Sequence, residues 1–519
     1  MGGKTSRVQE IENISLEQND EKTVESELET SYIHAGLTPE EASFLANFSP
    51  ERRKKCIRKI DWRLCPMLMI LYLCAYIDRT NVGNAKIEGL VEDLGLSSKQ
   101  YNFAVSIFFL PYVICEVPSN VILSKFKRPS TYIGIITVGW GVAMTLTGVI
   151  NNFGGLVATR MVLGIFEAGF FPGAVLLVSR WYISSETYLR IALFYCASAL
   201  SGGFSGLLAF AIAKMRGLGG YNGWRWIFIV EGLASVLIGI GCFFLLVDSA
   251  PLSTRWLEPD EIKFLELRQR AERGRVVVDE DPGKFDRATL WQVVTDWQLY
   301  LQIINFWSSA VPNYGMKFTM PQIIKNMGYT SSKAQLLTVP PYMVGAISAY
   351  VSSLLSDRYR WRFPFLVFGQ TCIVIAFAIL FSKAADIKDN VGLCYFAVMF
   401  SCIGFYPITP GINAWTVNNL AGARKKAMGI AFMISIGNLA GIPGSFIYIE
   451  SEKPKYPTGF GSSFAFAGSG IIASIILELG YIRINKRKAQ MTREEVHEKY
   501  TDEQLQKMGD RSPLFKYML

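Results

Sequence analysis

Long apolar runs recur along this sequence, and they constrain its fold more than any other feature. Half of its 519 residues are hydrophobic and only 18% are charged, a balance that departs from soluble domains towards polytopic membrane proteins. A helix that crosses the apolar part of a bilayer needs about 20 mainly apolar residues. Twelve segments meet this requirement, near residues 62–82, 101–123, 131–150, 156–178, 188–212, 225–247, 297–319, 335–355, 363–382, 391–415, 426–447 and 463–484.

The order of these segments predicts an all-α polytopic membrane protein with twelve transmembrane helices in two pseudo-symmetric six-helix bundles. A polar stretch that contains SAPLSTRWLEPDEIKFLELRQRAERGR separates the two sets, and its middle has the pattern of an amphipathic helix. Basic hinges, SNVILSKFKRPS and SSLLSDRYRWRFP, follow the second and the eighth segments, which indicates a weak internal repeat. We therefore expect an acidic then basic, mostly disordered tail at 1–60, bundles at 61–247 and 297–485, a central loop at 248–296 and a second tail at 486–519.

The distribution of positive charge predicts which side of the membrane the loops face. Lys and Arg are dense at 51–63, at 255–275 and at 483–488, and an even number of spans puts these stretches on one face. Cytoplasmic segments beside membrane spans are rich in Lys and Arg, so we expect both termini and the central loop in the cytoplasm. The first stretch would also contact anionic membrane lipid. With no targeting motif in view, we expect the plasma membrane.

The residue inventory excludes some kinds of chemistry. The two histidines, His34 and His497, both lie in the polar tails. The nine cysteines have no CxxC spacing and lie mostly in apolar runs, where cysteine behaves as a small hydrophobic residue. We therefore expect no metal site, no cofactor and no histidine-based catalytic centre. In a membrane protein the net charge of +9 bears on lipid and topology and not on nucleic acid.

One apolar run carries charge where a membrane helix normally excludes it. The stretch LYLCAYIDRTNVGNAK, residues 71–86, holds Asp78, Arg79, Asn81 and Lys86. A carboxylate or guanidinium in a membrane span costs about 2.5 to 3.5 kcal/mol on insertion scales, so such groups are rarely present without a use. The planar guanidinium fork of Arg79 matches a carboxylate. The cluster therefore predicts a binding site or pathway for an ionic solute.

A second group of charges lies in the fourth span. Arg160 and Glu167 are seven residues apart, about two helical turns, and so share one face of the helix. Gly169 follows and allows local unwinding. Burial favours the neutral form of a carboxylic acid and a nearby cation favours its charged form. An acid that gains and loses a cationic partner would therefore carry protons, and the alternative is a structural pairing of Asp78 with Arg79 or of Arg160 with Glu167.

Aromatic and amide side chains in other spans are further candidates. Tyr314 and Phe306 in the seventh span, with Phe170 and Phe171 in the fourth, would form an aromatic wall for a flat substrate, or would only pack the helices together. Asn438 lies between glycines in ISIGNLAGIPG, either as a substrate contact or as an interhelical hydrogen-bonding group. Near the end of the tenth span, the residues expected to line a cytoplasmic gate are Asn413, Trp415 and Asn418.

Four motifs resemble those of the major facilitator superfamily, and three of them resemble its anion:cation symporter branch, in particular the fungal allantoate and nicotinate permeases. The motifs are SDRYRWR at 356–362, IDRTNVGNAK at 77–86, RMVLGIFEAGFFPG at 160–173 and GWRWIFIVEG at 223–232. The resemblance covers about residues 60–485 and implies the major facilitator fold. The first-half loop departs from the family pattern, because Ser124 and Lys125 stand where an acidic residue is usual.

The resemblance also implies roles for individual residues. Asp78 and Glu167 would be the proton-coupling sites, and Arg160 would tune Glu167. Asp357 and Arg358 would form a gating ion pair. Together with the candidates above, the expected substrate-binding residues are Arg79, Asn81, Arg160, Tyr314 and Asn438.

The implied function is proton-coupled uptake of a small organic anion of the nicotinate, allantoate or pantothenate type, by a monomer. One alternative is export of a secondary metabolite by proton antiport, but antiporters of the superfamily usually carry a Gly-Pro motif in the fifth span, and 196–210 contains no proline. A membrane-embedded transferase would need a nucleophile and a base or an acidic metal cluster. No DxD pair or GxSxG elbow occurs in the spans, so we expect a transporter and not an enzyme.

Overall fold

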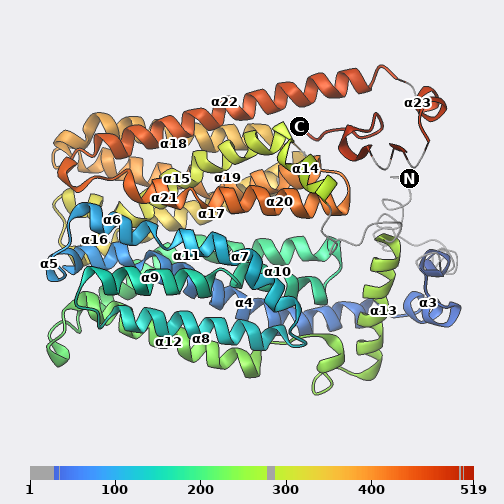
Figure 1. Ribbon diagram of the computed structural model, residues 1–519, viewed down its shortest axis with the longest axis horizontal. Coiled ribbons are helices and arrows are strands. Elements are labelled where there is room, and N and C mark those ends of the chain that lie inside the picture. The colour runs from blue at the N-terminus through green and yellow to red at the C-terminus, as the bar shows by residue number, and fades with distance from the viewer. Residues whose placement is uncertain are drawn as a thin grey trace.

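The structure is helical throughout the part of the chain that it describes (Figure 1). This computed structural model describes residues 28–33, 36–276, 287–359, 361–491, 493–501, 504–505 and 508–519, and contains no β-strand within them. The predicted all-α class is confirmed. Most of the tail that we predicted to be disordered, residues 1–27, lies outside these ranges. The later part of that tail contains α3 (Pro39–Ala46) and the start of α4 (Pro50–Ile87).

The helices of the N-terminal half form the lower layer in Figure 1. The first of them, α4, is 38 residues long and begins well before the predicted span at 62–82. Lys and Arg are good helix formers in water, so the basic stretch extends the membrane helix beyond its apolar part. The other helices of this half are α6 (Ser98–Ser106), α7 (Phe109–Ser124), α8 (Pro129–Thr147), α9 (Phe153–Glu167), α10 (Phe170–Trp181), α11 (Ser184–Ala213) and α12 (Gly223–Leu245).

The helices of the C-terminal half form the upper layer. Its first long helix, α15 (Trp297–Asn326), continues past the predicted boundary at residue 319, although Pro312 and Pro321 lie inside it. Prolines are tolerated in membrane helices where neighbouring groups satisfy the freed backbone. The other helices of this half are α16 (Ser331–Leu336), α17 (Val339–Tyr359), α18 (Phe363–Lys383), α19 (Val391–Asn419), α20 (Ala423–Asn438), α21 (Gly441–Phe446) and α22 (Pro457–Lys488).

The observed helices account for the predicted spans. In the described part of the chain, nine helices or consecutive helix pairs are long and apolar enough to cross a membrane. The remaining three predicted spans coincide with α11, α15 and α17. Three predicted spans are interrupted and consist of the pairs α6 with α7, α9 with α10 and α20 with α21. The break between α9 and α10 falls at Ala168 and Gly169, where we expected local unwinding.

Several pairs of helices join the two halves, among them α6 with α21 and α11 with α16. α4 packs against α15, and α11 packs against α17, while α8 with α12 and α18 with α19 pack within their own halves. At one crossing, a Cβ on Gly83 of α4 would lie 2.8 Å from the backbone oxygen of Phe318 on α15. The absence of a side chain at Gly83 therefore brings α4 and α15 into close contact.

The central loop forms a platform at the end of the bundles that also holds α3. A helix, α13 (Pro259–Val276), lies where we predicted an amphipathic one, and α14 (Arg287–Val294) precedes α15. Glu261 of α13 accepts from Lys59 of α4 at 2.7 Å, and Phe48 stacks on Phe264 with ring centroids 4.2 Å apart. Part of the basic stretch at 51–63 is therefore bound to the central loop.

The C-terminal residues 508–519 return to the same end of the C-terminal half. The Tyr517 ring stacks on Tyr481 with centroids 5.0 Å apart, and the Met518 carbonyl oxygen accepts from the indole N–H of Trp415 at 3.0 Å. Asn418, which we expected beside a gate together with Trp415, donates to the Met518 sulfur at 3.2 Å. The tail therefore covers these two residues.

Candidate functional site

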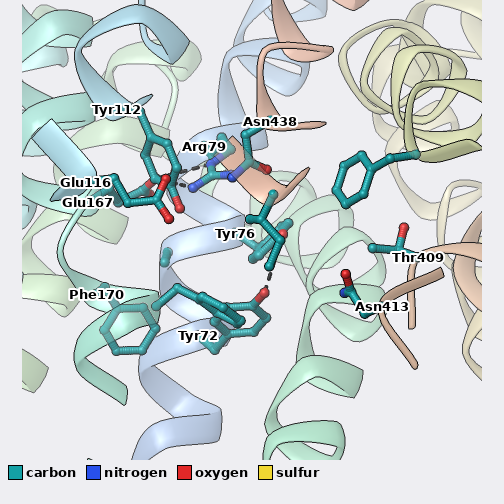
Figure 2. Close-up of a pocket in the computed structure, with 14 residues that line it drawn as sticks. Tyr72, Tyr76, Arg79, Tyr112, Glu116, Glu167, Phe170, Thr409, Asn413 and Asn438 are labelled. Atoms are coloured by element: carbon teal, nitrogen blue, oxygen red, sulfur yellow. Dashed lines mark hydrogen bonds and ion pairs between the residues drawn. The ribbon is translucent and has the colours of Figure 1, made fainter. Parts of the chain in front are cut away.

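A cavity lies between the two halves, and the space in its first lobe is about 600 Å³ when the part open to solvent is included. α4, α7, α9 and α10 line it from the N-terminal half, and α15, α19 and α20 line it from the C-terminal half. Duplicated bundles of this kind hold their substrates at the interface of the repeats. The lining residues, most of them labelled in Figure 2, are Tyr72, Ala75, Tyr76, Arg79, Tyr112, Glu116, Glu167, Phe170, Phe171, Phe306, Thr409, Asn413, Ile434 and Asn438.

The space in a second lobe is about 490 Å³, again with the part open to solvent included. This lobe shares four lining residues with the first, Tyr76, Phe306, Thr409 and Asn438. Its remaining lining comes from α11, α15 and α19, and these residues are Ser198, Ala310, Asn313, Tyr314, Lys317, Phe405 and Tyr406. The two lobes are therefore adjacent parts of one site.

A buried ion pair joins α4 to α9 in the first lobe. Arg79 donates from Nη2 to Glu167 Oε2 at 2.7 Å and from Nε to the same oxygen at 3.1 Å (Figure 2). Arg79 is 5% exposed and Glu167 is 1% exposed. Both hydrogen bonds use one carboxylate oxygen, and the other, Oε1, has no hydrogen-bond partner in the described structure. Glu167 is the last residue of α9, so the break before α10 directly follows it.

Aromatic rings surround the guanidinium of Arg79. Its Cζ lies 5.0 Å from the centroid of Tyr76, 4.8 Å from that of Phe108 and 4.8 Å from that of Tyr112. Cations are attracted to ring faces at such distances, and more strongly in the absence of water. The rings also exclude water from the Arg79–Glu167 pair, which strengthens the attraction between the two charges.

Arg160 supports the backbone of the ion pair and does not pair with Glu167. It is 1% exposed, and its Nη2 donates to the backbone oxygen of Arg79 at 3.3 Å. Its Nε and Nη1 have no hydrogen-bond partner among the described residues. The bonded companion of Glu167 is Arg79, and neither of the structural pairings that we considered occurs. Spacing within one helix indicated a common face but could not reveal the partner 88 residues away.

Asp78 faces a different neighbour. It is 1% exposed, and its Oδ2 accepts from the hydroxyl of Ser235 on α12 at 2.6 Å. Glu231, also on α12, is 5% exposed, and neither of its oxygens has a hydrogen-bond partner in the described structure. Asp78 therefore lies at a buried acidic site on the α12 side of α4, whereas Arg79 faces the cavity.

Asn81 lies in a chain of hydrogen bonds between α4 and α11. Asn84 donates to the Ser205 hydroxyl at 2.8 Å, which donates to the Asn81 side-chain oxygen at 2.9 Å. Asn81 is fully buried. In this conformation Asn81, which we predicted to bind substrate, links two helices.

The cavity lining includes three residues that we predicted from the sequence, Tyr314, Phe306 and Asn438. Tyr314 packs edge-on against Phe109, with ring centroids 4.9 Å apart, across the two halves. Phe170 and Phe171 line the first lobe beside Tyr72. The expected aromatic wall is therefore present as a feature of the cavity, and its role in binding stays a prediction.

Sequence reasoning missed one charged residue of the site, Lys317 on α15. It is 6% exposed and lines the second lobe. Its Nζ lies 4.7 Å from the centroid of Tyr76 and 5.7 Å from that of Tyr406. Among the described residues no carboxylate oxygen lies within 4.0 Å of it. The available signal was a single lysine near the end of a predicted span.

At the end of the molecule opposite α13, polar contacts hold the two halves together. Lys86 at the end of α4 pairs with Glu450, between α21 and α22, at 2.7 Å. Lys325 donates to the backbone oxygen of Ile87 at 3.2 Å. These contacts join the two halves at this end.

The predicted gating pair, Asp357 and Arg358, lies near the end of α17. Arg358 is exposed near the end of α17, and the side chain of Asp357 lies outside the described part, so their gating role stays a prediction. Among the described residues, no cluster of three or more His, Cys, Asp or Glu has the arrangement of a metal site.

Comparison with known proteins identifies the family. The family model described as Major Facilitator Superfamily matches residues 68–445. The MFS-type transporter cnsO of Penicillium expansum is 35% identical over 480 residues, which cover 91% of this chain and 92% of that protein. The high-affinity nicotinic acid transporter of Saccharomyces cerevisiae is 30% identical over 468 residues, which cover 90% of this chain and 85% of that protein.

Solved structures agree with this assignment at the level of the fold. The xylose transporter XylE from E. coli, in a partially occluded inward-open conformation, matches with a TM-score of 0.61 and 14% identity over 81% of this chain and 97% of that chain. A bacterial homologue of the human lysosomal transporter Spinster matches with a TM-score of 0.60 and 15% identity, over 83% and 97%. The relatives are membrane transporters, which confirms the prediction of a transporter and not an enzyme. With its family model matched over most of its length, the chain belongs to the major facilitator superfamily.

Proposed function

We propose that this transporter imports a small organic anion together with a proton. The observation that carries the proposal is the buried Arg79–Glu167 pair at the cavity between the two halves. A guanidinium is the side chain best suited to bind a carboxylate in a dry site. In the present conformation the guanidinium of Arg79 is bound to the carboxylate of Glu167.

Protonation of Glu167 would release Arg79 for the substrate. The unbonded oxygen Oε1 can accept a proton, and a neutral Glu167 no longer attracts the guanidinium as an ion. The anion then takes the place of the carboxylate. The charged groups coupled electrostatically to Glu167 are Arg79, Arg160 and Asp78. Because one proton and one carboxylate enter at the Arg79–Glu167 pair together, the charge of this pair and its ligand is conserved during loading.

The empty carrier returns through the ion-paired state. Once the anion and the proton have left, Glu167 and Arg79 pair again and no uncompensated charge remains between them. Because the empty carrier returns only in the ion-paired state, the downhill flow of protons drives the uphill flow of the anion. We propose that the bundles at 61–247 and 297–485 rock about the site, as in other transporters with duplicated halves.

The substrate class is a carboxylate that a flat aromatic wall accommodates. A relative is named as a nicotinic acid transporter, and Phe170, Phe171 and Phe306 line the first lobe. Both observations support a nicotinate-type carboxylate as the first substrate to test. We place the protein in the plasma membrane. The basic stretches at 51–63 and 483–488 are near the same end of the molecule (Figure 1), which supports a cytoplasmic location for both termini.

Glu167→Gln tests the proton-coupled mechanism. In proteoliposomes with an imposed pH gradient, acid outside, the wild type should accumulate labelled nicotinate, and the variant should not. The variant should still exchange labelled for unlabelled nicotinate, since exchange requires no net proton movement. Loss of exchange with a normal amount of folded protein, or unchanged accumulation, contradicts the proton role. Net efflux in place of uptake would instead identify an exporter.

A further inference from the structure

The cavity contains a second buried cation that the proposed mechanism does not use. Lys317 comes from α15 of the C-terminal half, whereas Arg79 comes from α4 of the N-terminal half. Both cations lie over the ring of Tyr76, the Arg79 Cζ at 5.0 Å and the Lys317 Nζ at 4.7 Å from its centroid. The distance between the Arg79 Cζ and the Lys317 Nζ therefore cannot exceed the sum of these two distances, about 10 Å. One small molecule can span it.

The two cations differ in their partners. Arg79 has a resident carboxylate, Glu167, at 2.7 Å. Lys317 lies against the rings of Tyr76 and Tyr406 and near the Cys402 thiol, and the described residues place no carboxylate within ion-pair distance of it. Glu116 lines the first lobe and is not paired with either cation in the described structure. A buried ammonium without a counter-ion is costly, so the site lacks an anionic group at Lys317.

Resting on the proposed function, we infer that the substrate is a two-ended anion, with one carboxylate at Lys317 and a second anionic group at Arg79. Both cations contact the ring of Tyr76, which lines both lobes together with Phe306, Thr409 and Asn438. A flat dicarboxylate would extend along this aromatic surface. Its two ends would contact cations of opposite halves, so that bound substrate draws α4 and α15 together.

The order of binding follows from the partners. The carboxylate at Lys317 binds without displacing any protein group, whereas the end at Arg79 binds only after Glu167 has accepted a proton. A monocarboxylate that binds Arg79, as in the proposed function, would leave Lys317 without an anion. The site therefore favours a dicarboxylate over a monocarboxylate with the same ring.

Uptake of benzoate and the three benzenedicarboxylates into proteoliposomes tests this inference. The wild type should take up at least one dicarboxylate in preference to benzoate. Lys317→Gln should lower uptake of that dicarboxylate by about tenfold or more, the value of one charge-assisted hydrogen bond, and should lower benzoate uptake less, so that the ratio of dicarboxylate to benzoate uptake falls. Lys317→Arg should restore the preference. Lys383→Gln, which removes an exposed lysine at the end of α18, is the matched control.

The possible outcomes separate this inference from the proposed function. If benzoate and nicotinate are transported but no dicarboxylate is preferred, or if Lys317→Gln lowers all substrates equally, the two-ended anion is refuted and the proposed function stands. If the wild type transports no carboxylate under a pH gradient, the proposed function itself fails. Thermal unfolding of purified Lys317→Gln beside the wild type shows separately whether the variant is folded.

Discussion

Removing the cation from the buried ion pair should destabilise the protein far more than breaking an exposed pair. Arg79→Gln deletes both hydrogen bonds to Glu167 Oε2, at 2.7 and 3.1 Å, and leaves a carboxylate that is 1% exposed without its counter-ion. Loss of one partner of a buried pair costs about 3–5 kcal/mol, because the remaining charge cannot return to water. We expect a loss of stability of this size.

An exposed ion pair provides the matched control. Arg52 and Glu258 also form an arginine–glutamate pair, at 3.2 Å, but their side chains are 50% and 64% exposed. Such pairs contribute about 0–1 kcal/mol, so Arg52→Gln should have little effect. Unfolding of the purified variants in detergent, by denaturant or by heat, measures the difference.

The double variant Arg79→Gln/Glu167→Gln tests the reasoning more sharply. It removes both charges, so we expect it to be more stable than Arg79→Gln alone despite carrying one more substitution. The double-mutant cycle should then give a coupling energy of about 1.5–3 kcal/mol. If the two single effects simply add, or if Arg79→Gln is as mild as Arg52→Gln, the ion pair does not stabilise the structure as we argue.

Three further predictions concern other parts of the molecule. Gly83→Ala should slow uptake and cost about 1–3 kcal/mol, because the new methyl group would lie 2.8 Å from the Phe318 backbone oxygen. Glu450→Gln removes the ion pair with Lys86, which joins the two halves at the end opposite α13. The population of molecules open at this end should rise about fivefold for each kcal/mol lost, as measured by labelling of an introduced cysteine. Deletion of 508–519 should lower stability by about 2–4 kcal/mol through loss of buried aromatic and ionic contacts.

Each of these predictions has an outcome that contradicts it. Gly392 has open space around it, so Gly392→Ala controls for substitution in a helix, and equal effects at Gly83 and Gly392 would argue against close packing of α4 on α15. Unchanged cysteine labelling in Glu450→Gln would show that the pair does not hold this end closed. A truncated chain as stable as the full one would show that the C-terminal contacts contribute nothing.

The sequence predicted the helices well because apolar length alone determines which segments can cross a bilayer. It also located the charged cluster around Arg79, since charge within an apolar run is conspicuous. The predicted helix boundaries were less accurate at charged residues, because charge ends a membrane span whereas Lys and Arg are good helix formers. The basic residues 51–63 before the predicted span belong to α4, and α15 continues past the expected boundary at residue 319.

The site itself could be predicted only in part, because partners depend on how the helices pack. The seventh span was expected to end two residues after Lys317, so this lysine resembled an ordinary residue at the membrane surface. In the structure α15 continues to Asn326 and places Lys317 in the cavity. Similarly, Asn81 looked like a substrate contact, but Ser205 of α11 uses its side-chain oxygen. Neither fact follows from spacing along one helix.

The central claim is that an anion and a proton enter the carrier together at the Arg79–Glu167 site. Its most direct test is the proton flux that a substrate causes in proteoliposomes containing a pH-sensitive dye, with no pH gradient imposed. Addition of nicotinate or a benzenedicarboxylate outside should acidify the interior for the wild type and not for Asp78→Asn/Glu167→Gln. If the double variant acidifies the interior as fast as the wild type while taking up the anion, coupling at these acids is contradicted.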